Sequence, residues 1–225
     1  MKIEIIPSIN VENLEEFKYR IKLLEDLTNY FHLDISDIEF TGYQSWGNIK
    51  DLSLLEIENQ NKLIFDVHLM MNLKAQEVLK WGREIVKNLI LHLEGSLNPD
   101  GLLRIAKKTK KNILIAWSPD LDFDFIKKYL PYTNGILILG VSPGRSGQKF
   151  LSETYSRISL IKPILNANQK LGIDGGINEE NFKEIIKFKP NFLVMGSALY
   201  NADNPQQKFK WFLNEIEKFE DYSLF

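Results

Sequence analysis

The sequence predicts an α/β fold, a single (β/α)8 TIM barrel with a parallel eight-stranded core. Short apolar segments alternate along the whole chain with segments of helical spacing, and repeated β-then-α units form parallel sheets. Eight such units close into a barrel. The strand segments are nearly continuous apolar runs, which is typical of strands covered on both faces. Because no Gly-rich GxGxxG turn follows the first strand, an open doubly wound sheet is disfavoured.

Composition narrows the classes of function. The 225 residues carry a net charge of −2, and lysine and arginine are spread along the chain, so no basic stripe indicates a nucleic-acid or membrane surface. No apolar run approaches the roughly 18 residues of a membrane span, and residues 1–5 indicate a strand rather than a signal peptide. The chain has no cysteine, which fits a reducing compartment. We expect a cytoplasmic protein whose residues 1–225 form one domain, without nucleic-acid or membrane partners.

Local patterns place the individual elements. The first helix is predicted to end at Leu24, with Asn10 or Asn13 as its N-cap. The polar, Gly-containing segment 36–50 is predicted to be a long loop. Strands are predicted at residues 3–7, 30–35, 63–68, 88–93, 113–117, 135–141, 171–174 and 192–195. Further helices are predicted at residues 75–86, 102–108, 123–130, 152–166, 179–188 and 206–219.

Polar side chains gather at the carboxyl ends of these strands, where active sites lie in this fold. Side chains two apart on a strand face the same side, so His32 and Asp34 face one way. His68, His92 and Asp174 also lie near strand ends, which places all 3 histidines of the chain on one rim. An imidazole beside a carboxylate indicates a metal-ligand pair or an acid–base pair. The alternative for such a pair is a buried structural histidine held by an aspartate.

One combination of these residues suits a metal ion. Two imidazoles and two carboxylates fit one divalent ion such as Zn²⁺, Fe²⁺ or Mn²⁺, and the candidate ligands are His32, Asp34, His68 and Asp174. A magnesium or calcium site would use oxygen ligands only. Asp66 shares a strand face with His68, so it either orients the second ring nitrogen of His68 or is a solvated or helix-capping carboxylate.

Three Gly-containing loops follow the last three predicted strands and together indicate a phosphate site. Glycine lets backbone N–H groups approach an anion closely, and in this fold phosphate commonly lies by the loops after strands seven and eight. Arg145 either strengthens a phosphate contact or is simply solvated. The candidate residues are Gly144, Arg145, Ser146, Gly147, Gly175, Gly176, Gly196 and Ser197.

With these motifs assembled, the chain resembles the ribulose-phosphate 3-epimerase family and the allied hexulose-phosphate 3-epimerases. The Asp-Val-His-Leu-Met run at 66–70 and the Pro-Gly-x-x-Gly-Gln loop at 143–148 are the most specific matches. The matching segments follow the family's order over nearly the whole chain, at residues 6–8, 32–37, 66–70, 92–94, 141–150, 174–178 and 196–197.

The resemblance implies a metal-dependent epimerisation at C3 of a ketose phosphate, with D-ribulose 5-phosphate and D-xylulose 5-phosphate as the foremost pair, through an ene-diolate. It implies that Asp34 and Asp174 carry protons as well as hold the metal with His32 and His68. Ser8 and His68 would touch the sugar, and the glycine loops would hold its phosphate. The resemblance also implies a homo-oligomer.

The chain departs from the family pattern in the pocket wall while keeping the proposed ligands. Residues 40–46 replace an expected Phe-Val-Pro-Asn stretch. Two alternatives follow, a 3-epimerase of a hexulose 6-phosphate such as allulose 6-phosphate, and a relative that binds metal and phosphate without catalysis. Single positions also differ, with Ser36 and Leu139 in place of methionine, Ile38 in place of glycine, and Arg145 and Ser146 in place of a Phe-Gly pair.

Overall fold

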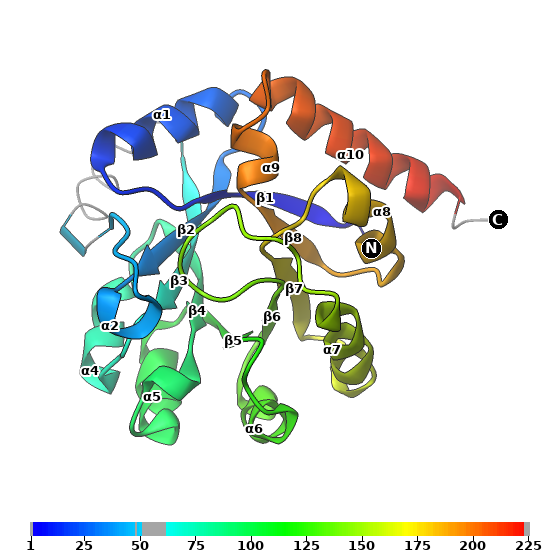
Figure 1. The fold of residues 1–225 in the computed structure, drawn as a ribbon. Coiled ribbons are helices and arrows are strands. Elements are labelled where there is room, and N and C mark those ends of the chain that lie inside the picture. Colours follow the sequence, from blue (N-terminus) through cyan, green and yellow to red (C-terminus); the bar gives the residue numbers. More distant parts are fainter. Residues whose placement is uncertain (1, 48, 51–61, 223–225) are drawn as a thin grey trace.

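Eight parallel strands form a closed barrel in sequence order, from β1 to β8 and back to β1 (Figure 1). This closed strand order confirms the predicted TIM barrel. The structure, a computed structural model, describes residues 2–47, 49–50 and 62–222. The strands are β1 Glu4–Ile9, β2 Tyr30–Ser36, β3 Ile64–Met70, β4 Val86–Leu91, β5 Asn112–Trp117, β6 Gly135–Leu139, β7 Lys170–Asp174 and β8 Phe192–Met195.

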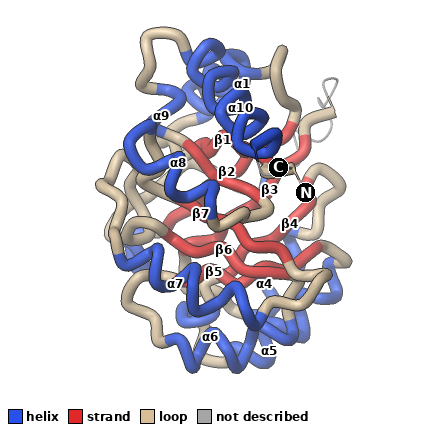
Figure 2. Tube along the Cα trace, turned by 90° about the vertical axis from the view of Figure 1, so that its right-hand side faces the viewer, coloured by secondary structure: helices blue, strands red, loops and turns tan. Residues whose placement is uncertain are grey.

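Helices cover the outside of the barrel, and Figure 2 shows the strands lying within this outer layer. Short 3-10 segments extend several helices, at Leu79–Trp81, Leu93–Gly95, Lys107–Thr109, Leu130–Tyr132 and Lys162–Ile164. Among the described residues, no helix is long and apolar enough to cross a membrane. The helices are α1 Leu14–Leu24, α2 Ile38–Thr41, α4 Ala75–Val78, α5 Pro99–Ala106, α6 Phe123–Tyr129, α7 Glu153–Ile161, α8 Glu179–Lys187, α9 Ser197–Tyr200 and α10 Pro205–Tyr222.

The start of α1 distinguishes the two predicted caps. Asn13 is the N-cap, and its side chain accepts a hydrogen bond from the backbone N–H of Glu16 at 2.9 Å. Asn10 instead lies just after β1 and points its amide toward the loop that follows β6. The prediction that α1 ends at Leu24 is confirmed.

Two predicted helices are shorter than the sequence pattern indicated. The helix predicted at 75–86 is wrong beyond Trp81, because Gly82 ends the 3-10 turn and Val86 already begins β4. The helix predicted at 152–166 gives way to a 3-10 turn after Ile161, where Pro163 cannot supply an N–H to an α-helix.

The predicted long loop at 36–50 contains a short helix, and position 48 within it lies outside the described residues. The side chain of Asp37 accepts a hydrogen bond from the N–H of Phe40 and starts α2. Gly42 ends α2 in the left-handed conformation, with φ of 70°. Helix α9, directly after β8, was also missed because its 4 residues are too few to show periodicity.

Alternation along the strands separates two hydrophobic regions. On β6, Ile136 and Ile138 join the large cluster between strands and helices, whereas Leu137 and Leu139 join a smaller cluster with residues of other strands. Tyr30 belongs to this inner cluster. His32 and Asp34, two and four residues further along β2, share the inward face of Tyr30, so polar groups replace apolar packing toward the carboxyl end of the barrel.

Candidate active site

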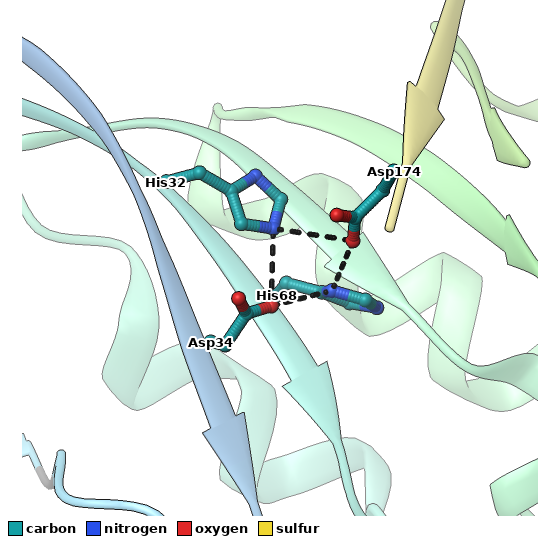
Figure 3. Close-up of side chains that lie close together, drawn as sticks. All are labelled: His32, Asp34, His68 and Asp174. Atoms are coloured by element: carbon teal, nitrogen blue, oxygen red, sulfur yellow. Dashed lines mark hydrogen bonds and ion pairs between the residues drawn. The ribbon is translucent and has the colours of Figure 1, made fainter. Parts of the chain in front are cut away.

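Strands β2 and β3 bring imidazoles and a carboxylate together inside the carboxyl end of the barrel. His32 and Asp34 share one face of β2, as the alternation along the strand predicted. The strand register pairs Asp34 with His68 on β3, so these residues are neighbours. Asp174 is the last residue of β7 and approaches from another part of the barrel wall (Figure 3). The four residues that the sequence suggested as metal ligands are thus brought together.

Each of the four side chains turns one nitrogen or oxygen toward a common centre (Figure 3). Asp34 Oδ1 lies 3.3 Å from His32 Nε2 and 3.0 Å from His68 Nδ1. Asp174 Oδ2 lies 4.0 Å from His32 Nε2 and 3.6 Å from His68 Nδ1. One potential ligand atom from each residue lies within 4.8 Å of the others, so the group could hold one metal ion.

Geometry and donor chemistry both fit a divalent ion. Two ligands that lie roughly 2.0–2.2 Å from one ion are at most roughly 4.4 Å apart. The four separations given above, each between a histidine nitrogen and a carboxylate oxygen, respect that limit, and all four atoms lie within 4.8 Å of one another. His32 is fully buried, and neither of its ring nitrogens has a hydrogen-bond partner among the described residues. An ion at this centre would give Nε2 a partner once the ring has released its proton. Two nitrogen and two oxygen donors suit zinc, iron or manganese.

Without a bound ion, the charged forms of His32 and Asp34 stabilise each other. Burial opposes the charged form of each group, but the two side chains interact strongly enough to outweigh it. The Asp34 carboxylate raises the pKa of His32 to about 9. His32 in turn is the main group that holds the pKa of Asp34 well below its usual range. Asp34 is therefore a carboxylate at neutral pH.

The other aspartate and histidine of the group have the opposite pKa shifts: the pKa of Asp174 is raised and that of His68 is lowered. Burial, and then the nearby Asp34 carboxylate, raise the pKa of Asp174 to about 7. Burial lowers the pKa of His68 to about 4, so its imidazole is neutral and has a lone pair to offer. The two carboxyl groups of the site thus differ in protonation near neutral pH, although both are aspartates.

Ser8 lies next to the carboxylate on β2. Its Oγ donates a hydrogen bond to Asp34 Oδ2 at 2.5 Å, while the other oxygen of Asp34 faces the two imidazoles. Ser8 pairs with His32 in the register of β1 and β2, which explains the close approach. This contact fixes the orientation of the carboxylate from the side opposite the histidines.

His92 continues the site on the far side of His68. His92 Nε2 lies 3.0 Å from His68 Nε2, and His92 Nδ1 lies 2.8 Å from Glu94 Oε1. Ser118 Oγ donates to the same Glu94 oxygen at 2.6 Å. Burial would raise the pKa of Glu94, but the hydrogen bonds from His92 and Ser118 lower it overall. All three histidines therefore belong to one connected group, as their places at strand ends suggested.

The suggestion that Asp66 orients His68 is not supported by the contacts. Residues two apart on a strand are separated by roughly 6.6 Å along it, so Asp66 lies one layer deeper in the barrel than His68. There Asp66 Oδ1 accepts hydrogen bonds from Tyr30 at 2.6 Å and from Asn88 at 2.6 Å. Asp66 is completely buried, so the alternative of a solvated carboxylate is wrong as well.

A pocket at this end of the barrel contains the carboxylates and the glycine loops. Its lining also includes Asn10, Met70 and Gln148, which the sequence reasoning missed. Asn10 lies two residues after Ser8, so strand alternation was a signal that could have found it. His32 lies beneath the lining. The predicted residues that line the pocket are Ser8, Asp34, His68, Gly144, Arg145, Ser146, Gly147, Asp174, Gly175, Gly176, Gly196 and Ser197.

The loop after β7 needs glycine at the pocket wall. Gly176 has φ of 71°, which side-chain-bearing residues rarely adopt, and a Cβ there would lie 2.7 Å from the Cα of Phe150. The two loops after β6 and β7 are thus packed backbone against backbone.

The loop after β6 reaches across the mouth of the barrel toward β1 and α2. Asn10 Nδ2 donates to the carbonyl oxygen of Gly144 at 2.7 Å, and a Cβ at Gly144 would lie 3.1 Å from Thr41 Cβ. Arg145 is exposed, and its guanidinium lies over the ring of Tyr43, 5.2 Å from the ring centre. The divergent segment 40–46 therefore contacts the loop that was predicted to hold phosphate.

Comparison with known proteins identifies the family. The model of the ribulose-phosphate 3 epimerase family matches residues 4–200. The chain belongs to this family. It is therefore an epimerase, an isomerase of carbohydrate metabolism, as the sequence motifs predicted.

Similar proteins span most of the chain. A ribulose-phosphate 3-epimerase of Buchnera aphidicola subsp. Baizongia pistaciae is 26% identical over 185 residues, which are 81% of this chain and 81% of that protein. The enzyme of the same name from Chlamydia muridarum is 27% identical over 199 residues, 86% of either chain. Among solved structures, KGPDC from Streptococcus mutans has a TM-score of 0.71 at 9% identity and covers 97% of this chain and 99% of its own. The orotidine 5'-phosphate decarboxylase of Pyrococcus horikoshii OT3 has a TM-score of 0.66 at 18% identity, covering 95% and 99% of the two chains. These structural likenesses concern the fold alone.

Proposed function

We propose that this epimerase inverts C3 of a ketose phosphate and interconverts D-ribulose 5-phosphate and D-xylulose 5-phosphate. The observation that carries the proposal is the approach of two aspartates from separate strands to one imidazole nitrogen. Asp34 Oδ1 and Asp174 Oδ2 lie 3.0 and 3.6 Å from His68 Nδ1. Inversion next to a carbonyl needs a base on one face of the carbon and an acid on the other, and two opposed carboxyl groups supply both.

Asp34 and Asp174 are the proton carriers of this proposal. In the protein alone the pKa of Asp34 is well below its usual range, whereas that of Asp174 is raised to about 7. Two carboxyl groups of unequal pKa can divide the roles of base and acid. One takes the C3 proton to leave an ene-diolate, the other returns a proton to the opposite face, and the roles exchange in the reverse reaction. The hydrogen bond from Ser8 orients Asp34 for this transfer.

The divalent metal would be held by His32, Asp34, His68 and Asp174. When bound, the ion supplies Lewis-acid stabilisation of the negative charge that develops on the substrate oxygens. The chain's own contribution is to present two imidazoles and two carboxyl groups from the inside of a buried barrel wall. Direct metal analysis of the purified protein distinguishes zinc, iron and manganese.

The substrate's phosphate is assigned to the glycine loops at the other end of the pocket. Backbone N–H groups near Gly176 and Gly196 can approach an anion closely because no Cβ covers them, whereas the N–H of Gly144 donates to Met70 Sδ at 3.3 Å. The sugar carbons would then extend from this wall toward Ser8 and His68. Residues of both ends line one pocket, which supports this placement.

A hexulose 6-phosphate is the second candidate, and Asn10 is the observation that favours it. Its Nδ2 is bonded to Gly144, but its buried Oδ1 has no hydrogen-bond partner among the described residues. An acceptor at the pocket wall suits a further sugar hydroxyl. A longer sugar has one more hydroxyl than ribulose 5-phosphate to offer.

Turnover of the two sugars by the purified, metal-loaded protein tests the proposal. We expect conversion of D-ribulose 5-phosphate in deuterated water, with deuterium appearing at C3 in the NMR spectrum. Faster turnover of allulose 6-phosphate and none of the pentulose would establish the second candidate instead. If metal binds but neither sugar exchanges its C3 proton, the chain is a binding protein and the catalytic proposal fails.

A further inference from the structure

We propose that His92, held by Glu94, is a positioning residue that keeps Nδ1 of His68 free of a proton and turned toward the metal group. This inference rests on the proposed function and specifies how one ligand of that site is prepared. His92 follows β4, and Glu94 lies in the 3-10 segment Leu93–Gly95. Neither residue is among the four proposed ligands.

The two imidazoles meet through their Nε2 atoms rather than by stacking face to face. The Nε2 atoms are 3.0 Å apart, while the ring centres of His68 and His92 are 5.1 Å apart. The ring planes differ by only 12°. Since the N–H bond and the lone pair of an imidazole lie in the ring plane, edge-to-edge rings of similar orientation suit an N–H···N hydrogen bond.

The position of one proton follows from the partners of these rings. A metal-binding histidine is neutral and ligates through the nitrogen without hydrogen. His68 faces the group through Nδ1, so its proton belongs on Nε2, from which it is donated to His92 Nε2. The proton of His92 then belongs on Nδ1, where the Glu94 carboxylate accepts it at 2.8 Å. Every donor in this hydrogen-bonded series has an acceptor, and the carboxylate at its end also accepts from Ser118.

Two acceptors compete for the proton of His68. Asp34 Oδ1 is 3.0 Å from Nδ1, and a proton held there would block the nitrogen from a metal. His92 Nε2 lies at the same distance from Nε2 on the other side of the ring. Because Glu94 accepts the proton of His92 on its far nitrogen, His92 Nε2 is left as an acceptor. The hydrogen-bonded series therefore favours the tautomer of His68 that can ligate.

Packing keeps this arrangement in place. The side chains of His68 and His92 are 1% and 0% exposed, so no solvent molecule replaces the contact between them. Phe40 and His92 pack edge to face, with ring centres 5.0 Å apart and ring planes at 63°. Phe40 belongs to α2, so part of the divergent segment 40–46 also holds His92.

Metal affinity and tautomer state of the full-length protein together test the inference. His92→Phe keeps a ring but removes the acceptor, whereas His92→Gln places an amide oxygen near the former Nε2. We expect His92→Phe to weaken Mn²⁺ binding by about 10–100-fold, the usual effect of losing a group that orients a ligand. We expect His92→Gln to restore most of the affinity, and ¹⁵N NMR of the metal-free protein to show His68 protonated at Nε2 in the wild type and at Nδ1 in His92→Phe.

Mn²⁺ affinity close to wild type in His92→Phe, with an unchanged His68 tautomer, would overturn the inference. If His92→Phe does not fold, Glu94→Leu combined with Ser118→Ala removes both oxygens near His92 Nδ1, at 2.8 and 3.1 Å, leaves both rings and carries the same expectation. The wild type separates this inference from the function on which it rests. A wild type that binds no Mn²⁺ contradicts the proposed metal site, whereas tight wild-type binding that both variants retain contradicts only the role of His92.

Discussion

Asp34 and Asp174 enter the barrel interior from β2 and β7, and each places one carboxylate oxygen within 4.0 Å of the same nitrogen of His68. Their environments differ, because Asp34 also accepts from Ser8 and lies nearer to His32. Asp174 is buried beside a carboxylate that is already charged, which raises its pKa to about 7. Two identical side chains are thereby given different proton affinities by their surroundings.

The first prediction concerns Asp174→Asn. An amide cannot exchange protons with C3, and removal of a general acid or base typically lowers rates by about 10²–10⁴-fold. We expect turnover of the ketose phosphate and deuterium exchange at C3 to fall by at least that factor, while circular dichroism and thermal unfolding show an intact fold. Asp26→Asn is the matched control, because Asp26 is exposed in the turn before β2. Near-normal turnover in Asp174→Asn would refute the role assigned to this carboxylate.

The second prediction concerns the pH dependence of metal binding. An ion must displace the protons that its ligands carry in the protein alone. The pKa of His32 is raised to about 9 and that of Asp174 to about 7, so both groups are protonated at pH 6 and only His32 remains so at pH 8. His68, with its pKa lowered to about 4, releases no proton over this range.

Affinity for Mn²⁺ should therefore rise with pH, by about tenfold per pH unit above pH 7 and more steeply below it. Calorimetry in two buffers of different ionisation enthalpy counts the protons released on binding. We expect close to two protons at pH 6 and close to one at pH 8. An affinity that is constant between pH 6 and 8 would contradict the proposed protonation of His32.

Strand periodicity predicted the site's members but not their partners. His32 and Asp34 are two residues apart in an apolar run, and Asp174 ends another such run, so their convergence follows from barrel geometry. The partner of each ring nitrogen depends instead on register between strands. The sequence suggested Asp66 for the second nitrogen of His68, but Asp66 lies deeper in the barrel, and His92 contacts that nitrogen instead.

Local sequence patterns also gave wrong element boundaries where tertiary contacts override hydrophobic periodicity. The helical pattern that starts at Ala75 would continue to Val86, but Val86 is needed to pair with Phe65 in the barrel. Helix α2 depends on a cap at Asp37 and a left-handed Gly42, within a segment whose composition resembles a loop. Short elements of this kind are fixed by single hydrogen bonds, which hydrophobic periodicity does not report.

The third prediction compares two left-handed glycines. Gly176 and Gly42 have nearly equal φ values of 71° and 70°, but only Gly176 faces other backbone where its Cβ would be. Gly42→Ala should cost about 1–2 kcal/mol of unfolding free energy, the cost of the left-handed conformation. Gly176→Ala should cost roughly 1–3 kcal/mol more, because a Cβ would lie 2.7 Å from the backbone of Phe150.

The same pair tests the placement of the phosphate. Gly176 lines the pocket and Gly42 does not, so only Gly176→Ala should raise KM for the sugar phosphate. Denaturant unfolding and steady-state kinetics measure the two effects on the same samples. Equal KM values for the two variants would remove Gly176 from the phosphate site, whatever their stabilities.

The fourth prediction concerns the bond between Asn10 and the loop after β6. Asn10→Leu removes the donor to the buried carbonyl of Gly144, which costs about 1–3 kcal/mol, but it also removes the unpaired Oδ1 of Asn10. The two effects on folding oppose each other, so we expect the melting temperature to change little. The loop, however, loses its bond to β1 and positions the pocket wall less well.

KM for the sugar phosphate should therefore rise by about tenfold in Asn10→Leu, with a smaller change in kcat. Gln148→Leu provides an independent comparison, because Gln148 Nε2 bonds the carbonyls of Ser142 and Arg145 within the same loop at 2.8 and 2.7 Å. If the loop's position is what the substrate needs, both variants should raise KM. A rise in Gln148→Leu without one in Asn10→Leu would show that the loop is held from within, and that the contact with Asn10 does not contribute to binding.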